Sequence, residues 1–140
     1  MEIALVTGEA GIRRCHLLMS LLRPHLDCAE FVSTVQRLQA DHGYQLVQLD
    51  EGGQLRALAG IRIGEWLHRG RYLEIEELVT AEADRSRGHG RALLAWIAAH
   101  ARTQGCTQLR LVSGLQRHDA HRFYEREGMR HEAMYFSLDL

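Results

Sequence analysis

The sequence has few cysteines and no long apolar run, and both shortages exclude classes of protein. Its three cysteines, Cys15, Cys28 and Cys106, include no CxxC pair. An odd number without close pairs does not support a disulfide framework, and the spacing beside His16 and His25 matches no common zinc module. No apolar run reaches the roughly 18 residues of a membrane span. We therefore expect no metal, no membrane partner and a cytoplasmic location.

An excess of charge of either sign is also missing. The 140 residues carry 17 Lys and Arg against 18 Asp and Glu, a formal net charge of -1, which argues against a general nucleic-acid binder. Glu2 and Glu9 interrupt the amino-terminal stretch, so no signal peptide is predicted. An apolar share of 46% suits an ordinary globular protein, and nothing resembles a linker or a repeat. These properties predict a single domain over residues 1–140.

The periodicity of apolar residues predicts an alternating series of strands and helices. Strands are expected at 3–6, 44–49, 55–63, 72–80, 108–112 and 135–140, and helices at 12–22, 27–42, 92–104 and 120–127. Asp27 and Gly43 are expected to cap the second helix, and Asp119 the last. The order predicts an α/β (α+β) domain with a mixed, mostly antiparallel sheet flanked by about four helices.

A glycine-rich turn stands between the strand at 72–80 and the helix at 92–104. Its sequence is Arg85-Ser86-Arg87-Gly88-His89-Gly90-Arg91, an R-x-x-G-x-G pattern. Glycines leave backbone amides accessible where the helix starts, and a helix start carries unpaired N–H groups and a partial positive charge. The turn is therefore predicted to hold an anionic group such as a pyrophosphate.

The strand at 72–80 breaks its own alternation. Leu73 and Ile75 face one side, and strict alternation would bury Glu77 with them, which is costly for an unpaired carboxylate. One extra residue near Glu76-Glu77 restores Leu78 to the apolar side, so a β-bulge is predicted there. An exposed edge strand, where alternation matters little, is the alternative.

Two motifs in this order resemble the GNAT superfamily of N-acetyltransferases. The first joins Leu78-Val79-Thr80 to the R-x-x-G-x-G turn and Arg91-Ala92-Leu93-Leu94. The second is Phe123-Tyr124 shortly before Gly128-Met129. The resemblance covers essentially the whole chain and implies acetyl transfer from acetyl-CoA to a primary amine of an unidentified acceptor. It also implies that a homodimer can form.

The resemblance implies a place for each part of acetyl-CoA. Backbone amides of Arg85, Ser86, Arg87, Gly88, His89, Gly90 and Arg91 would hold the pyrophosphate. Backbone groups of Leu78, Val79 and Thr80 would pair with the pantetheine arm where the bulged strand splays from 108–112. The N–H of Val79 would polarise the thioester carbonyl.

The resemblance also implies catalytic residues, and no metal is required. Tyr124 sits where many members place the phenol that protonates the departing thiolate. Glu74 matches the strand carboxylate that some members use as general base, and Glu76 or Glu77 acting through water is equally open. A non-catalytic acyl-CoA sensor and a nucleotide or RNA-phosphate binder remain as alternatives.

Overall fold

The computed structural model describes residues 1–81 and 87–140. Residues Met1–Arg110 form one compact unit and Leu111–Leu140 form a second, and we describe each unit by itself. The sheet and most helices belong to the first unit, whereas the second contains one helix and the carboxyl-terminal segment.

The observed elements follow the predicted order closely. The strands are β1 (Glu2–Leu5), β2 (Gln45–Glu51), β3 (Gln54–Trp66), β4 (Gly70–Thr80) and β5 (Gln108–Leu111). The helices are α1 (Gly8–Arg14), α2 (His16–Met19), α3 (Cys28–His42), α4 (His89–Thr103) and α5 (His118–Arg126). The described residues thus hold five helices where about four were predicted.

The five strands lie in sequence order in a single mixed sheet. The pairs β1–β2, β2–β3 and β3–β4 are antiparallel. Two contacts show that β5 instead runs parallel to β4, because both join residues 36 apart: Thr107 N donates to Arg71 O, and Arg110 pairs with Glu74. The predicted mixed, mostly antiparallel sheet is confirmed.

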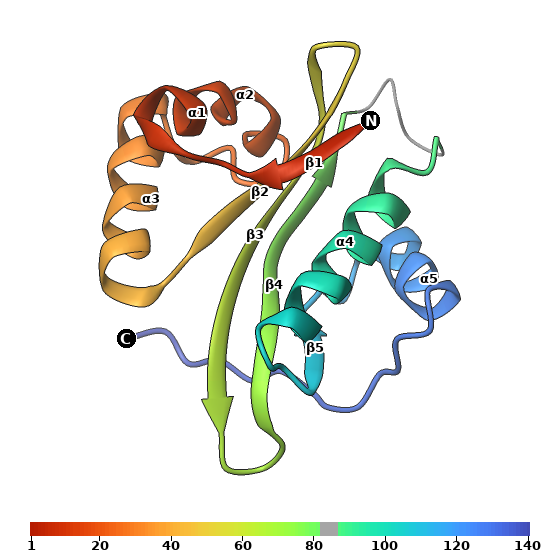
Figure 1. Cartoon of the computed structure of the whole chain (residues 1–140). Helices are drawn as coiled ribbons and strands as arrows, with labels where there is room; N and C mark the ends of the chain where they lie inside the picture. Colours follow the sequence, from red (N-terminus) through yellow and green to blue (C-terminus); the bar gives the residue numbers. More distant parts are fainter. Residues whose placement is uncertain (82–86) are drawn as a thin grey trace. The chain divides into compact units, whose positions relative to one another are not determined.

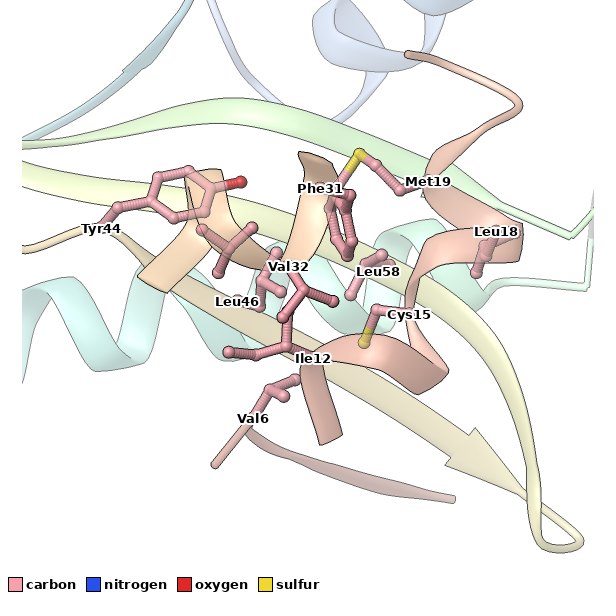
Figure 2. Packing of buried hydrophobic residues seen from close by; sticks show 11 residues of the cluster. Val6, Ile12, Cys15, Leu18, Met19, Phe31, Val32, Tyr44, Leu46 and Leu58 are labelled. Atoms are coloured by element: carbon pink, nitrogen blue, oxygen red, sulfur yellow. The ribbon is translucent and has the colours of Figure 1, made fainter. Parts of the chain in front are cut away.

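Helices cover both faces of this sheet in the first unit (Figure 1). Helices α1, α2 and α3 pack on one face, where Ile12, Phe31 and Val32 meet Leu46 of β2 and Leu58 of β3 (Figure 2). Helix α4 packs against β3 and β4 from the opposite face and buries Leu93, Leu94, Ile97 and Ala101. Strands β3 and β4 therefore separate two apolar layers.

The predicted helix at 12–22 is wrong in its bounds and in its apolar face. Helix α1 starts at Gly8, and a break at Cys15 separates it from α2. The amide of Cys15 donates to Ile12 O, a tighter i to i−3 bond that changes the phase of the next turn. As a result Leu18 is buried while Leu17 is 80% exposed.

Helix α3 is capped as predicted. The side chain of Asp27 accepts a hydrogen bond of 2.8 Å from the amide of Glu30, and Gly43 ends the helix. These local signals are confirmed because each cap depends only on residues next to it in the chain.

The second unit differs from prediction at both ends of its helix. Helix α5 begins at His118, so Asp119 lies in the first turn and pairs with Arg122 instead of capping. The predicted strand at 135–140 is also wrong, because the described residues after α5 form neither helix nor strand. Phe136 and Leu138 alternate with Ser137 and Asp139 but are 84% and 83% exposed, so the alternation lines no buried face.

Candidate active site on strand β4

A β-bulge in β4 organises the candidate site. Gly60 of β3 pairs with Glu77, whereas the next residue, Ile61, pairs with Ile75. Glu76 is therefore the extra residue. This confirms the bulge that the broken alternation predicted, and it places Leu78, the partner of Ala59, on the same side as Ile75.

Three carboxylates line the other face of β4, on the side of α1 to α3. Each one meets an arginine from a different segment: Glu74 pairs with Arg110 of β5, Glu76 with Arg62 of β3, and Glu77 with Arg23 in the turn after α2. The surroundings of the three carboxylates differ.

Glu74 lies in a stack of aromatic and cationic groups. Its Oε1 accepts a hydrogen bond of 2.8 Å from Arg110 Nε. The Arg110 guanidinium lies 3.5 Å from the centre of the Tyr72 ring and 4.3 Å from that of Trp66. These cation–π contacts fix the arginine, and the arginine holds the Glu74 carboxylate.

Glu76 is the carboxylate whose pKa is raised. Arg62 Nε lies 3.0 Å from Glu76 Oε2, and both side chains are partly exposed. Desolvation at the bulge raises the pKa of Glu76, the charge of Arg62 lowers it, and the charges of Glu77 and Glu74 add to the rise. A raised pKa makes a carboxylate a stronger proton acceptor.

Glu77 is enclosed. Its Oε1 accepts from the Tyr44 hydroxyl at 2.5 Å and its Oε2 from Arg23 at 3.2 Å, and its side chain is 13% exposed. Burial and the Glu77 charge raise the pKa of Tyr44. The Tyr44 hydroxyl therefore stays protonated and donates a hydrogen bond to the Glu77 carboxylate.

Beyond the bulge, alternate residues of β4 turn their backbone groups toward opposite edges. The amide of Ala81 donates to Arg56 O, so the antiparallel ladder also directs Val79 toward its partner Leu58. Leu78 and Thr80 consequently present their N–H and C=O groups to the edge on which β5 lies. The proposed oxyanion role of the Val79 N–H conflicts with this register.

Helix α4 begins inside the glycine turn, three residues earlier than predicted. Gly88 is the N-cap, with a φ of 81°, and the first intrahelical bond runs from Ala92 N to Gly88 O. The amides of His89 and Gly90 precede that bond, so helix geometry gives them no acceptor within α4. Gly88 and Arg87 are exposed. Arg85 and Ser86 lie outside the described residues.

The side chain of His89 ties this turn to the β2–β3 hairpin. His89 is 3% exposed, and its Nε2 lies 2.7 Å from Oε2 of Glu51. The hydrogen bond from His89 lowers the pKa of Glu51. The sequence predicted a role for the backbone amide of His89 only and did not indicate this contact of its side chain.

Tyr124 belongs to α5 in the second unit. It is partly buried, its ring packs edge-on against Phe123 with 5.5 Å between centroids, and burial raises its pKa. A phenol with a raised pKa holds its proton firmly, as a proton donor at neutral pH must.

Sequence reasoning did not find the partners of the carboxylates, Arg23, Tyr44, Arg62 and Arg110. One signal pointed toward Tyr44. Gly60 interrupts an apolar strand, and a glycine at such a position often marks the close approach of another group.

Comparisons with known proteins identify the group to which this site belongs. The family model described as "Acetyltransferase (GNAT) family" matches residues 14–129. The chain belongs to the GNAT acetyltransferase family. It is 38% identical to the Bacillus subtilis (strain 168) protein "Uncharacterized N-acetyltransferase YhdJ", over 85% of this chain and 84% of that protein.

A further relative and a solved structure each match most of the chain. The "Aminoalkylphosphonate N-acetyltransferase" of Salmonella typhimurium (strain LT2) is 31% identical over 89% of this chain and 81% of that protein. The aminoglycoside N-acetyltransferase AAC(6')-Iy, solved in complex with CoA, superposes with a TM-score of 0.84 over 99% of this chain and 95% of that one. At 15% identity the latter likeness concerns the fold.

These findings confirm the family, the fold class and the N-acetyltransferase activity that the two motifs predicted. Within residues 1–81 and 87–140, no helix is long and apolar enough to cross a membrane. The same residues contain no group of three metal-ligating side chains.

Proposed function

We propose that this GNAT protein transfers an acetyl group directly from acetyl-CoA to a primary amine at the bulged end of β4. The observation that supports this most is that three features follow one another along the chain. They are the bulge at Glu76, the backbone groups of Leu78 and Thr80 that face the β5 edge of β4, and the exposed glycine at the start of α4. An added strand and an anion would find their partners there in the right order along one chain segment.

The residues present suit acetyl-CoA. The amides of His89 and Gly90 stand at a helix start, where a pyrophosphate is favoured. Among the described residues, no atom beyond the two chain neighbours of Gly88 lies within 4 Å of where its Cβ would be. Arg87 and Arg91 add positive charge, and Arg85 and Ser86 remain part of the proposed cradle. When bound, acetyl-CoA supplies an activated acyl group.

Glu76 is the carboxylate we favour as general base. An alkyl ammonium has a pKa near 10 and must lose a proton before it can attack. Glu76, reached directly or through a water, accepts that proton, and Tyr124 donates one to the thiolate that leaves. Glu74 and Glu77 stay alternative bases; Glu74 accepts a hydrogen bond from Arg110, and Glu77 accepts one from Tyr44.

For the acceptor we propose a small amine that also carries an acidic group. Carboxylates and arginines alternate on the exposed part of this face, with Arg62 and Arg110 beside Glu74 and Glu76. The relative named for aminoalkylphosphonates supports the same class. A homodimer and a cytoplasmic location stay predictions.

Release of CoA, followed with a thiol reagent, tests the proposal. The panel comprises aminoalkylphosphonates, amino acids, polyamines, aminoglycosides and peptide amino termini. We expect turnover to be highest with an aminoalkyl acid. Binding of acetyl-CoA without turnover on any amine would favour the sensor, and stabilisation by ATP or RNA alone would overturn the proposal.

A further inference from the structure

At the bulge, the side chain of Glu77 is in contact with residues from three other segments of the chain. These residues are Arg23 after α2, Tyr44 before β2 and Gly60 of β3, and together with Glu77 of β4 we call them the bulge lock. None belongs to the glycine turn. Their contacts join the helical layer to the one irregular position in the β3–β4 ladder.

Both oxygens of Glu77 are already occupied within the lock. The Tyr44 hydroxyl donates to Oε1 at 2.5 Å, while Nε and Nη2 of Arg23 donate to Oε2 at 3.3 and 3.2 Å. Tyr44 is 4% exposed. A partly buried charge with these partners has a structural role, because removing it would leave the buried Tyr44 hydroxyl without its acceptor.

Arg23 also reaches the backbone of the bulge itself. Its Nη2 donates to the carbonyl oxygen of Glu76 at 3.1 Å. A bulge leaves the backbone groups of the extra residue outside the regular ladder, and a buried carbonyl without a donor is costly. The Arg23 guanidinium therefore donates a hydrogen bond to the backbone carbonyl that the bulge leaves outside the ladder.

Gly60 provides the space for this arrangement. It pairs directly with Glu77, and a Cβ at this position would overlap the Tyr44 hydroxyl oxygen and Glu77 Oε1. The hydrogen bond between those two side chains thus passes over the bare backbone of Gly60. The hydrogen bonds of Tyr44 and Arg23 to Glu77, the bond from Arg23 to the Glu76 carbonyl oxygen, and the absence of a Cβ at Gly60 all favour the same register of β3 and β4.

We propose that the bulge lock is a positioning device for the acyl-donor site. By holding Glu76 outside the ladder, the bulge lock makes the backbone groups of Leu78 and Thr80 face the edge of β4 on which β5 lies. A one-residue slip would turn them inward and carry Glu77 toward the α4 side. The inference rests on the proposed function only in naming the pantetheine arm as the group that uses this edge.

The test uses Glu77→Gln, Tyr44→Phe and Arg23→Ala in the full chain. A matched control is Arg14→Ala, because Arg14 of α1 pairs with Asp50 of β2 at 2.5 Å and so also joins a helix to the sheet, away from the bulge. Hydrogen exchange of the amides from Glu76 to Thr80 is measured together with KM for acetyl-CoA and kcat.

We expect exchange at these amides to accelerate at least tenfold in the three lock variants and not in the control. In Tyr44→Phe and Arg23→Ala, KM for acetyl-CoA should rise about tenfold while kcat at saturation stays within about threefold, and Arg23→Lys should recover part of the loss. Unchanged exchange in all three variants would overturn the lock. A wild type that neither binds nor uses acetyl-CoA would overturn the proposed function instead, because the exchange rates do not depend on it.

Discussion

At the scale of single residues, Glu76 is separated from Glu74 and Glu77 by its surroundings. Glu76→Gln should lower kcat/KM by about 10²- to 10⁴-fold, the range of general base catalysis. Because desolvation raises the pKa of Glu76, wild-type kcat/KM should climb as the pH passes upward through that raised value. The variant should lack this limb. Glu74→Gln is the comparison, and an equal loss there would reassign the base.

Tyr124 gives a second prediction. Tyr124→Phe should reduce turnover about 10²-fold at neutral pH, since the phenylalanine ring cannot donate a proton to the thiolate. Affinity for acetyl-CoA, measured by calorimetry, should stay near that of the wild type. An unchanged rate would remove Tyr124 from the chemistry.

Glu51 links the stability of the protein to pH. The hydrogen bond from His89 depresses the pKa of Glu51 below its ordinary 4.5 in the folded protein. Its contribution is therefore complete above that ordinary value and is lost as the pH falls through the depressed one. Urea unfolding should show Glu51→Gln to be less stable than wild type near about pH 6, and the difference should shrink as the pH falls through the depressed pKa. A constant difference would mean that the charge of Glu51 is not involved.

At the scale of elements, the start of α4 can be tested with two glycines of equal strain. Gly88 and Gly53 have φ values of 81° and 76°, and in the part of the chain that the structure describes nothing beyond their own chain neighbours lies within 4 Å of a Cβ position. Alanine at either position should cost about 1 kcal/mol, because both hold a left-handed backbone. Gly88→Ala alone should weaken acetyl-CoA binding, about tenfold by calorimetry, since only that methyl group stands at the helix start. Equal affinities would contradict a cradle at this helix.

The elements also show what the sequence could predict. The bulge could be predicted from the sequence, because strict alternation of the residues in β4 would bury Glu77 at a high cost. The caps of α3 were accessible because they are local. The break at Cys15 was not, since Leu17, Leu18, Leu21 and Leu22 also fit one uninterrupted helix. The surroundings of the three glutamates depend on arginines 14 to 54 positions away, which the sequence alone does not bring together.

At the scale of the whole molecule, ligand binding should appear as thermal stability. Acetyl-CoA at a hundred times its Kd adds about 2.7 kcal/mol, which for a chain of this size corresponds to a rise in Tm of roughly 10 °C. Scanning fluorimetry with and without acetyl-CoA measures it, and ATP is the control. A shift with ATP alone would oppose an acyl-CoA site.

The overlap at Gly60 has a consequence for how this sequence can diverge. Because the Tyr44 hydroxyl occupies the volume that a Cβ at position 60 would need, the two positions are coupled. A relative with a larger residue at the position of Gly60 should have lost the phenol at that of Tyr44, or the partner at that of Glu77. Substitutions at these sites are therefore expected to appear together in an evolutionary record, with Gly60 the last of them free to change.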